Sequence, residues 1–222
     1  MEDSCFNLYN PKIEARIESK DLLEKYKMIA GVDEAGRGPL FGRVYAAAVI
    51  LNEGFDVSRV KDSKKFTSEK KRQEAAEYIK ANSVWKVAWS DEVLIDQINI
   101  LQATMRAMRE AVLGVPADRL MVDGNYFKPV YRQVGNDKAG DMELIPFICI
   151  EKGDALHPCI SAASILAKVA HDDYVRDMCV EHPELEKYGL LKNKGYGTRA
   201  HLDAIREHGL SEWHRKSFKI RL

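Results

Sequence analysis

The chain has 222 residues, 45% of them hydrophobic, which is enough to bury one large core. Its 34 basic and 34 acidic side chains balance, so affinity for nucleic acid must come from a local basic patch. No apolar run approaches the length of a membrane span, the start of the chain lacks the pattern of a signal peptide, and the cysteines show no C-x-x-C spacing. These features predict a reduced cytoplasmic protein and exclude a membrane protein.

The first predicted elements surround an unusual glycine-rich stretch. Residues 1–27 form a lead-in to which we assign no role, although residues 13–26 have the apolar spacing of an amphipathic helix. Residues 28–33 predict a short buried strand, and residues 44–51 predict a second strand that pairs with it as an antiparallel hairpin.

The stretch between these strands, residues 31–42, reads GVDEAGRGPLFG. Asp33 and Glu34 fall at the carboxyl end of the first strand, where open α/β sheets bind ligands. Because side chains on a strand alternate faces, both carboxylates reach one site only if the chain bends between or just after them. The glycines permit that bend, and Arg37 adds a cation suited to phosphate oxygens. The stretch predicts metal ligands beside a phosphate cradle, although a solvated acidic turn would have the same composition.

A basic run follows the second strand. Residues 61–72 hold six basic and two acidic side chains and lead into a predicted helix through Thr67. Such a run is either a solvated helix face or a grip on backbone phosphates. We assign Lys64 and Lys65 to phosphate contacts.

A third strand is predicted at residues 84–89, and a helical region begins at Asp91. Asn99 and Gln102 on this helix are candidate amide donors to a nucleic-acid duplex. Core packing is predicted for a stripe at helical spacing: Leu101, Met105, Met108 and Val112.

Two later strands also end in acids. Residues 119–123 form a short apolar run that ends at Asp123, which repeats the position of Asp33. If these strands are parallel neighbours, the two carboxylates lie side by side. Residues 144–150 predict another strand, and Asp154 follows it.

A helix rich in small residues is predicted to begin at Pro158 and to pack its backbone close to the sheet. Asp154 is either a third acid of the site or a cap of this helix. Asp172 and Asp173 lie further along the helix and could reach a site, although we expect a helix of this length to expose such residues to solvent.

The final segment, residues 183–222, predicts a small helical extension that binds substrate. Tyr196 stands between glycines in basic company, where it is either a packing lid or a platform for a sugar or base. The last ten residues hold four basic side chains and no acid. We assign Arg215 and Lys216 to phosphate contacts.

Seven ordered motifs resemble signatures of type 2 ribonuclease H (ribonuclease HII) of bacterial type, over residues 28–218. They are GVDEAGRGPLFG at 31, KDSKKFT at 61, INILQATMRAM at 98, MVDGN at 121, EKGDALHPCISAASILAKVAHD at 151, KGYGT at 194 and EHGLSEWHRKSF at 207. The resemblance implies an α/β, ribonuclease H-like fold. A mixed central sheet flanked by helices would occupy residues 28–182, with the small helical extension after it.

The resemblance also implies an activity and a site. Four carboxylates would hold Mg²⁺ or Mn²⁺, with two ions in the substrate complex: Asp33, Glu34, Asp123 and Asp154. Gly36, Arg37 and Gly38 match the ribose-sensing loop, and Tyr196 matches the tyrosine that meets the ribonucleotide at a junction with DNA. A monomer would cut the RNA strand of RNA/DNA hybrids, and single ribonucleotides embedded in duplex DNA, leaving 3′-hydroxyl and 5′-phosphate ends. The chain departs from the family pattern at four positions: Arg43 and Gly197 for proline, Phe66 for leucine and His171 for arginine.

The residue types agree with this chemistry. Two hard cations about 3.5 to 4 Å apart can activate water and stabilise the leaving oxygen, and they prefer carboxylates to His or Cys. Three alternatives stay open. One is a catalytically inert nucleic-acid binding module, and another is a nucleotide-binding protein, although the loop lacks the ending of a P-loop. The third is a type 3 ribonuclease H, whose larger N-terminal domain would not fit in 27 leading residues.

Overall fold

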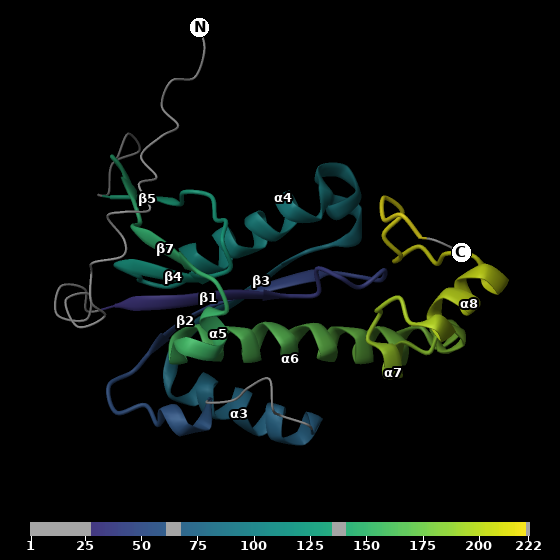
Figure 1. Ribbon diagram of the computed structural model, residues 1–222, viewed down its shortest axis with the longest axis horizontal. Coiled ribbons are helices and arrows are strands. Elements are labelled where there is room, and N and C mark those ends of the chain that lie inside the picture. The colour runs from purple at the N-terminus through teal and green to yellow at the C-terminus, as the bar shows by residue number, and fades with distance from the viewer. Residues whose placement is uncertain (1–27, 61–67, 135–140, 221–222) are drawn as a thin grey trace, which may run out of the picture.

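The computed structural model describes residues 28–60, 68–134 and 141–220 (Figure 1). The predicted helix at residues 13–26 and the predictions for Lys64, Lys65, Phe66 and Thr67 lie outside these ranges.

A mixed five-stranded sheet forms the centre, in the order β3-β2-β1-β4-β7. The first three strands of the chain pair antiparallel, whereas β4 lies parallel to both β1 and β7. The strands are β1 (Ile29–Ala35), β2 (Val44–Leu51), β3 (Ser83–Ser90), β4 (Arg119–Asp123) and β7 (Phe147–Ile150), and a separate hairpin joins β5 (Tyr131–Gln133) to β6 (Met142–Leu144). The predicted hairpin and the third strand are confirmed, and β4 is a parallel neighbour of β1, the arrangement under which Asp33 and Asp123 lie side by side.

Helices cover both faces of this sheet (Figure 1). Helix α6 packs on β1 and β2 with α3 beside it, and α4 packs on the opposite face. The helices are α3 (Glu69–Ala81), α4 (Glu92–Leu113), α5 (Gly153–Leu156), α6 (Pro158–Glu181), α7 (Leu190–Asn193) and α8 (Arg199–His208), with 3₁₀ turns η1 (Val57–Arg59) and η3 (Pro183–Tyr188). Ser68 caps α3 by accepting a hydrogen bond from the Lys71 N–H.

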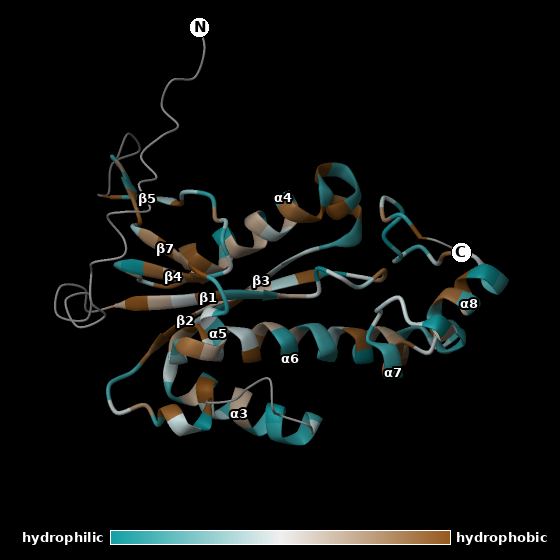
Figure 2. Ribbon diagram, in the orientation of Figure 1, coloured by the Kyte–Doolittle hydropathy of each residue, from teal (hydrophilic) through white to brown (hydrophobic). Residues whose placement is uncertain are grey.

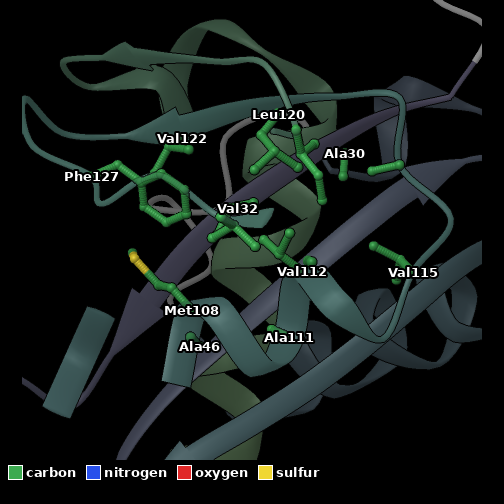
Figure 3. Close-up of a cluster of buried hydrophobic side chains, with 14 of the residues drawn as sticks. Ala30, Val32, Ala46, Met108, Ala111, Val112, Val115, Leu120, Val122 and Phe127 are labelled. Carbon is green, nitrogen blue, oxygen red and sulfur yellow. The ribbon is translucent and has the colours of Figure 1, made fainter. Parts of the chain in front are cut away.

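The core between α4 and the sheet confirms the predicted helical stripe. Met108 and Val112 of α4 meet Val32 of β1 and Val122 of β4 (Figure 3). Figure 2 shows the hydrophobic residues concentrated on the strands and on the helix turns that face them. Burial of these side chains removes apolar surface from water, which stabilises the fold by about 25 cal/mol for each Å² buried.

On the other face, α6 approaches β1 so closely that only glycine fits. A Cβ at Gly31 would lie 2.1 Å from the backbone carbon of Cys159. The predicted close packing of the small-residue helix is therefore confirmed. It holds α6 directly against the strand that carries Asp33.

The prediction of one strand over residues 144–150 is wrong. Leu144 ends β6 and Phe147 begins β7. Pro146 stands between them and has no N–H for a ladder, although its carbonyl accepts a hydrogen bond from the Leu120 N–H.

The C-terminal elements pack beyond the end of the sheet, around the last turns of α6 (Figure 1). Leu185, Leu190 and Ile205 share an apolar cluster with Phe41 and Tyr174. Within the described ranges, no helix is both long enough and apolar enough to cross a membrane.

Candidate active site

The two acids of β1 stand at its carboxyl end. The strand runs through Ala35, so the chain bends after both acids, at Gly36, whose φ is +88°. Asp33 is only 6% exposed, and it accepts hydrogen bonds from the Glu34 N–H and from Ser164 of α6.

The acid of β4 comes next to them because β1 and β4 pair in register, Val32 beside Val122. Asp123, the last residue of β4, therefore lies beside Asp33 of β1. Its Oδ1 accepts a hydrogen bond from the Asp154 N–H at 3.3 Å.

Asp154 belongs to the short helix α5 that follows β7, and it is 5% exposed. Helix α6 begins with Pro158 and has His157 as an N-cap without a side-chain hydrogen bond, so Asp154 does not cap it. The fold thus gathers acids from three neighbouring strand ends, and Asp154 is joined to Asp123 through its backbone.

The electrostatics show that these acids are close and poorly compensated. Burial raises the pKa of Asp33 well above its usual value, and the charges of Glu34 and Asp123 raise it further. Burial likewise raises the pKa of Glu34, whereas Arg37 opposes that shift. Removing carboxylates from water next to one another disfavours the charged forms, and a cation between them would restore those forms.

A pocket of about 310 Å³ opens beside the two β1 acids. It is lined by Glu34, Ala35, Gly36, Arg37, Gly38, Ser164, Lys168 and Tyr196. A larger hollow of about 580 Å³ lies between β3 and α4, but none of the strand-end acids lines it. The smaller pocket is the functional candidate because it joins the Glu34 carboxylate to two cations, a glycine loop and an exposed aromatic ring.

Arg37 contacts Glu34 directly. Its Nη1 donates to Glu34 Oε1 at 3.0 Å. Arg37 is half exposed, so this pair contributes little to stability, and the guanidinium can leave the carboxylate for a phosphate oxygen at small cost.

Tyr196 faces the glycines across the pocket. The residue is 41% exposed, and a Cβ at Gly38 would lie 3.3 Å from its Cε1. The Lys168 ammonium lies 5.6 Å from the ring centroid. The predicted exposure of Tyr196 is confirmed, and hydrogen bonds to its carbonyl from the Thr198 N–H and from His201 hold the loop on both sides of Gly197.

The expectation that Asp172 faces solvent is wrong. It is buried below the pocket and accepts hydrogen bonds from Lys168 and His171, with Arg72 nearby at 3.8 Å. A buried carboxylate requires such partners. His171 in turn packs beneath Gly36, where a Cβ would lie 2.5 Å from its ring.

The assignment of Arg215 to phosphate contact is also wrong. The side chain is fully buried, and all five of its N–H donors reach backbone carbonyls: those of Gly36, Arg37, Pro39, Gly42 and Arg43. No donor is left for a ligand. Burial lowers its pKa to about 10, so the guanidinium stays charged at neutral pH.

Three other residues proposed to contact substrate do not line this pocket. Asn99 is exposed at a kink of α4 with φ +67°, and its Oδ1 accepts a hydrogen bond from the Gln102 N–H, so it caps the second half of that helix. Gln102 in turn accepts a hydrogen bond from the Lys128 ammonium. Lys216 is exposed, and its backbone N–H donates to Asp96.

Sequence reasoning missed Ser164 and Lys168 as members of the site. Both line the pocket, and Ser164 donates to Asp33. Their spacing of four residues, continued by Asp172, places all three on one face of α6. That spacing was the available signal.

The fold and the acid cluster together define a nuclease of the ribonuclease H class. Residues 30–221 match the family model described as Ribonuclease HII, and the chain belongs to the ribonuclease HII family. A protein named Ribonuclease HII from Pelagibacter ubique is 42% identical over 194 residues, which cover 86% of this chain and 96% of that protein. The chain is therefore an endonuclease that hydrolyses the RNA strand of RNA/DNA hybrids.

Solved structures share the fold. The PCNA:RNase HII complex from Archaeoglobus fulgidus matches with a TM-score of 0.66 at 24% identity, over 88% of this chain and 96% of that one. Bst-RNase HIII in complex with Mn²⁺ matches with a TM-score of 0.57 at 19% identity, over 82% of this chain and 63% of that one.

Proposed function

We propose that the pocket beside β1 is a two-metal active site that also recognises single ribonucleotides embedded in duplex DNA. The observation that carries the proposal is that Glu34, which lies close to Asp33 and Asp123, also lines the pocket with the glycine loop and Tyr196. Cleavage would leave 3′-hydroxyl and 5′-phosphate ends. A monomeric state and a cytoplasmic location stay predictions.

The residues fit a hard divalent cation. The donors are carboxylates, which suit Mg²⁺ or Mn²⁺, and burial together with mutual repulsion raises the pKa of Asp33 and Glu34. Asp33, Glu34, Asp123 and Asp154 would hold the ions, and Mn²⁺ is the ion in the complex of the structural neighbour Bst-RNase HIII. Among the residues that the structure describes, no three Asp, Glu, His or Cys side chains converge tightly enough to hold a metal as they stand. Binding would draw the carboxylates inward.

The metals would supply an activated water and stabilise the leaving oxygen. The chain's own residues do the rest. Ser164 and the Glu34 N–H hold the Asp33 carboxylate, and the Asp154 N–H holds Oδ1 of Asp123, so these hydrogen bonds would orient both carboxylates toward a metal. Glu34 would exchange Arg37 for the metal, which releases the guanidinium toward the substrate phosphate.

Recognition of ribose would rest on the glycine loop and on Tyr196. RNA differs from DNA locally by the 2′-hydroxyl, and the glycine loop lets backbone N–H groups approach it without side-chain obstruction. The Tyr196 ring is positioned to lie against the same sugar. The extension of residues 183–222 carries this ring and would therefore bind substrate, with Lys216 as a candidate phosphate contact.

The proposal is tested by incubating the protein with a uniform RNA/DNA hybrid and with duplex DNA bearing one ribonucleotide, each in Mg²⁺, Mn²⁺ or chelator. Wild type should cut both substrates only with metal. Asp123→Asn should cut neither while keeping the wild-type circular dichroism spectrum. Full activity of Asp123→Asn, or cutting in chelator, would contradict the proposed site.

A further inference from the structure

A short C-terminal segment joins the two halves of the recognition pocket. We define the glycine loop as residues 36–43, the tyrosine loop as residues 194–198 and the clamp as residues 213–215. The Gly42 N–H donates to the Trp213 carbonyl at 2.9 Å, and the Arg215 N–H donates to the Leu40 carbonyl at 2.8 Å. The clamp therefore pairs with the glycine loop through an isolated antiparallel bridge between Phe41 and His214.

Arg215 then determines which way the glycine loop presents its peptide groups. Its guanidinium binds the Gly36 carbonyl at 2.6 Å and the Arg37 carbonyl at 3.1 Å. The described chain has no cis peptide bond, and in a trans peptide the N–H points opposite to the carbonyl. The N–H groups of Arg37 and Gly38 therefore point away from Arg215. Both residues line the pocket, and in the described part of the chain neither N–H has a protein acceptor.

The neighbouring clamp residue reaches the tyrosine loop through a histidine pair. The Ser211 N–H donates to His214 Nδ1 at 3.0 Å, so that nitrogen carries no proton. His214 Nε2–H must then donate to His201 Nε2, at 3.1 Å, which leaves His201 Nδ1–H to donate to the Tyr196 carbonyl at 3.0 Å. Only one arrangement of protons satisfies these contacts, with both rings neutral. Burial lowers the pKa of both histidines, that of His214 to about 4, in agreement with this arrangement.

We propose that Arg215 and the His214–His201 pair are positioning residues for ribose recognition. Arg215 aims two N–H groups of the glycine loop into the pocket, and the histidine pair fixes the backbone of Tyr196. Because His214 and Arg215 are adjacent, one segment contacts both loops, and it acts together with the direct hydrogen bond from the Leu40 N–H to the Gly195 carbonyl at 2.7 Å. The inference rests on the proposed function of the pocket, and it adds residues that touch no substrate.

The test compares cleavage with metal binding. Arg215→Ala and Arg215→Lys should lower kcat/KM on duplex DNA with one ribonucleotide by about tenfold to a hundredfold, the loss expected when a reacting group is misplaced by about 1 Å. The shift in melting temperature caused by Mn²⁺ should stay as in wild type, because the clamp contacts none of the carboxylates. Millimolar guanidinium should partly rescue Arg215→Ala, whereas sodium at equal ionic strength should not.

The histidine pair gives a second pair of variants that does not depend on Arg215→Ala folding. His201→Asn keeps an amide N–H near the position of Nδ1, and His201→Ala does not. His201→Asn should therefore cut the single-ribonucleotide duplex faster than His201→Ala. Ile79→Ala is the control, because Ile79 is fully buried in a core cluster that includes no clamp residue. It should lower stability and leave kcat/KM unchanged at temperatures at which it is folded.

Two results would overturn the proposed role of the clamp. One is wild-type kcat/KM in both Arg215 variants, and the other is a loss that tracks the unfolded fraction as it does for Ile79→Ala. Tyr196→Ala separates this failure from failure of the proposed function. If Tyr196→Ala is impaired and the Arg215 variants are not, the clamp alone is wrong. If all of them cut as wild type does, the recognition pocket is wrong and the clamp with it.

Discussion

Neutralising Asp33 should abolish cleavage and, without metal, make the protein more stable. Its carboxyl is buried beside Glu34 and Asp123, which raises its pKa well above the usual value. Each pKa unit corresponds to about 1.4 kcal/mol against the charged form. Asn keeps the oxygen that accepts hydrogen bonds and carries no charge. We therefore expect Asp33→Asn to be more stable than wild type in chelator at neutral pH, and each 1 kcal/mol gained would raise Tm by about 2 to 4 °C.

The sign of the pH dependence follows from the same shift. A carboxyl whose pKa is raised in the folded state binds more protons there than in the unfolded chain, so stability falls as pH rises between the two pKa values. The advantage of Asp33→Asn in chelator should therefore shrink as pH falls toward 4, the ordinary pKa of Asp. Added Mg²⁺ should stabilise wild type and not the variant, because the ion binds only the folded wild-type site.

The assay is thermal unfolding followed by circular dichroism, in chelator and in Mg²⁺, at pH 5 and pH 7.5. Asp141→Asn is the matched control, because Asp141 is exposed and its neutralisation should leave Tm unchanged. The reasoning is refuted if Asp33→Asn is no more stable than wild type in chelator at pH 7.5.

Further predictions concern recognition, packing and charge. Tyr196→Ala should depress cleavage at a single embedded ribonucleotide by the equivalent of about 1 to 3 kcal/mol, measured as kcat/KM, and unchanged activity would remove the ring from the site. Gly31→Ala should lower Tm strongly in thermal unfolding, because its Cβ would lie 2.1 Å from the Cys159 backbone, and a wild-type Tm would contradict the close packing. Lys216→Ala should weaken duplex binding uniformly and flatten the salt dependence of log K by about one unit, whereas an unaltered slope would make it a solvated lysine. Stability should fall as pH drops from about 6.5 toward 4, because the pKa of His214 is lowered to about 4, and His214→Gln should lose this part of the pH profile in urea unfolding.

The parts of the site that depend on local pattern could be predicted from the sequence. Asp33 and Asp123 each end a short apolar run, and the parallel pairing of β1 with β4 then places them together. The close packing of α6 followed from its small residues, and the core stripe of α4 followed from its helical spacing. The apolar runs, the small residues of α6 and the helical spacing of α4 are each visible within a short stretch of sequence.

The parts of the site that depend on partners far away in the chain could not be predicted from the sequence. A basic residue in a charged tail has the same local sequence whether it faces solvent or is buried, and only the carbonyls of residues 36–43 turn Arg215 inward. Asp172 is similar, because Arg72 on another helix helps to compensate its burial. The division of residues 144–150 by Pro146 was visible in the sequence, but the separate pairing of β5 with β6 was not.

The most direct test of the central claim uses two DNA duplexes of the same sequence that differ by one 2′-hydroxyl. With Mg²⁺ or Mn²⁺, the protein should cut the duplex that carries the ribonucleotide and leave 3′-hydroxyl and 5′-phosphate ends. The all-DNA duplex should stay intact under the same conditions. Equal cutting of the two duplexes would contradict the account, because the acids would then act without any recognition of ribose by the glycine loop and Tyr196.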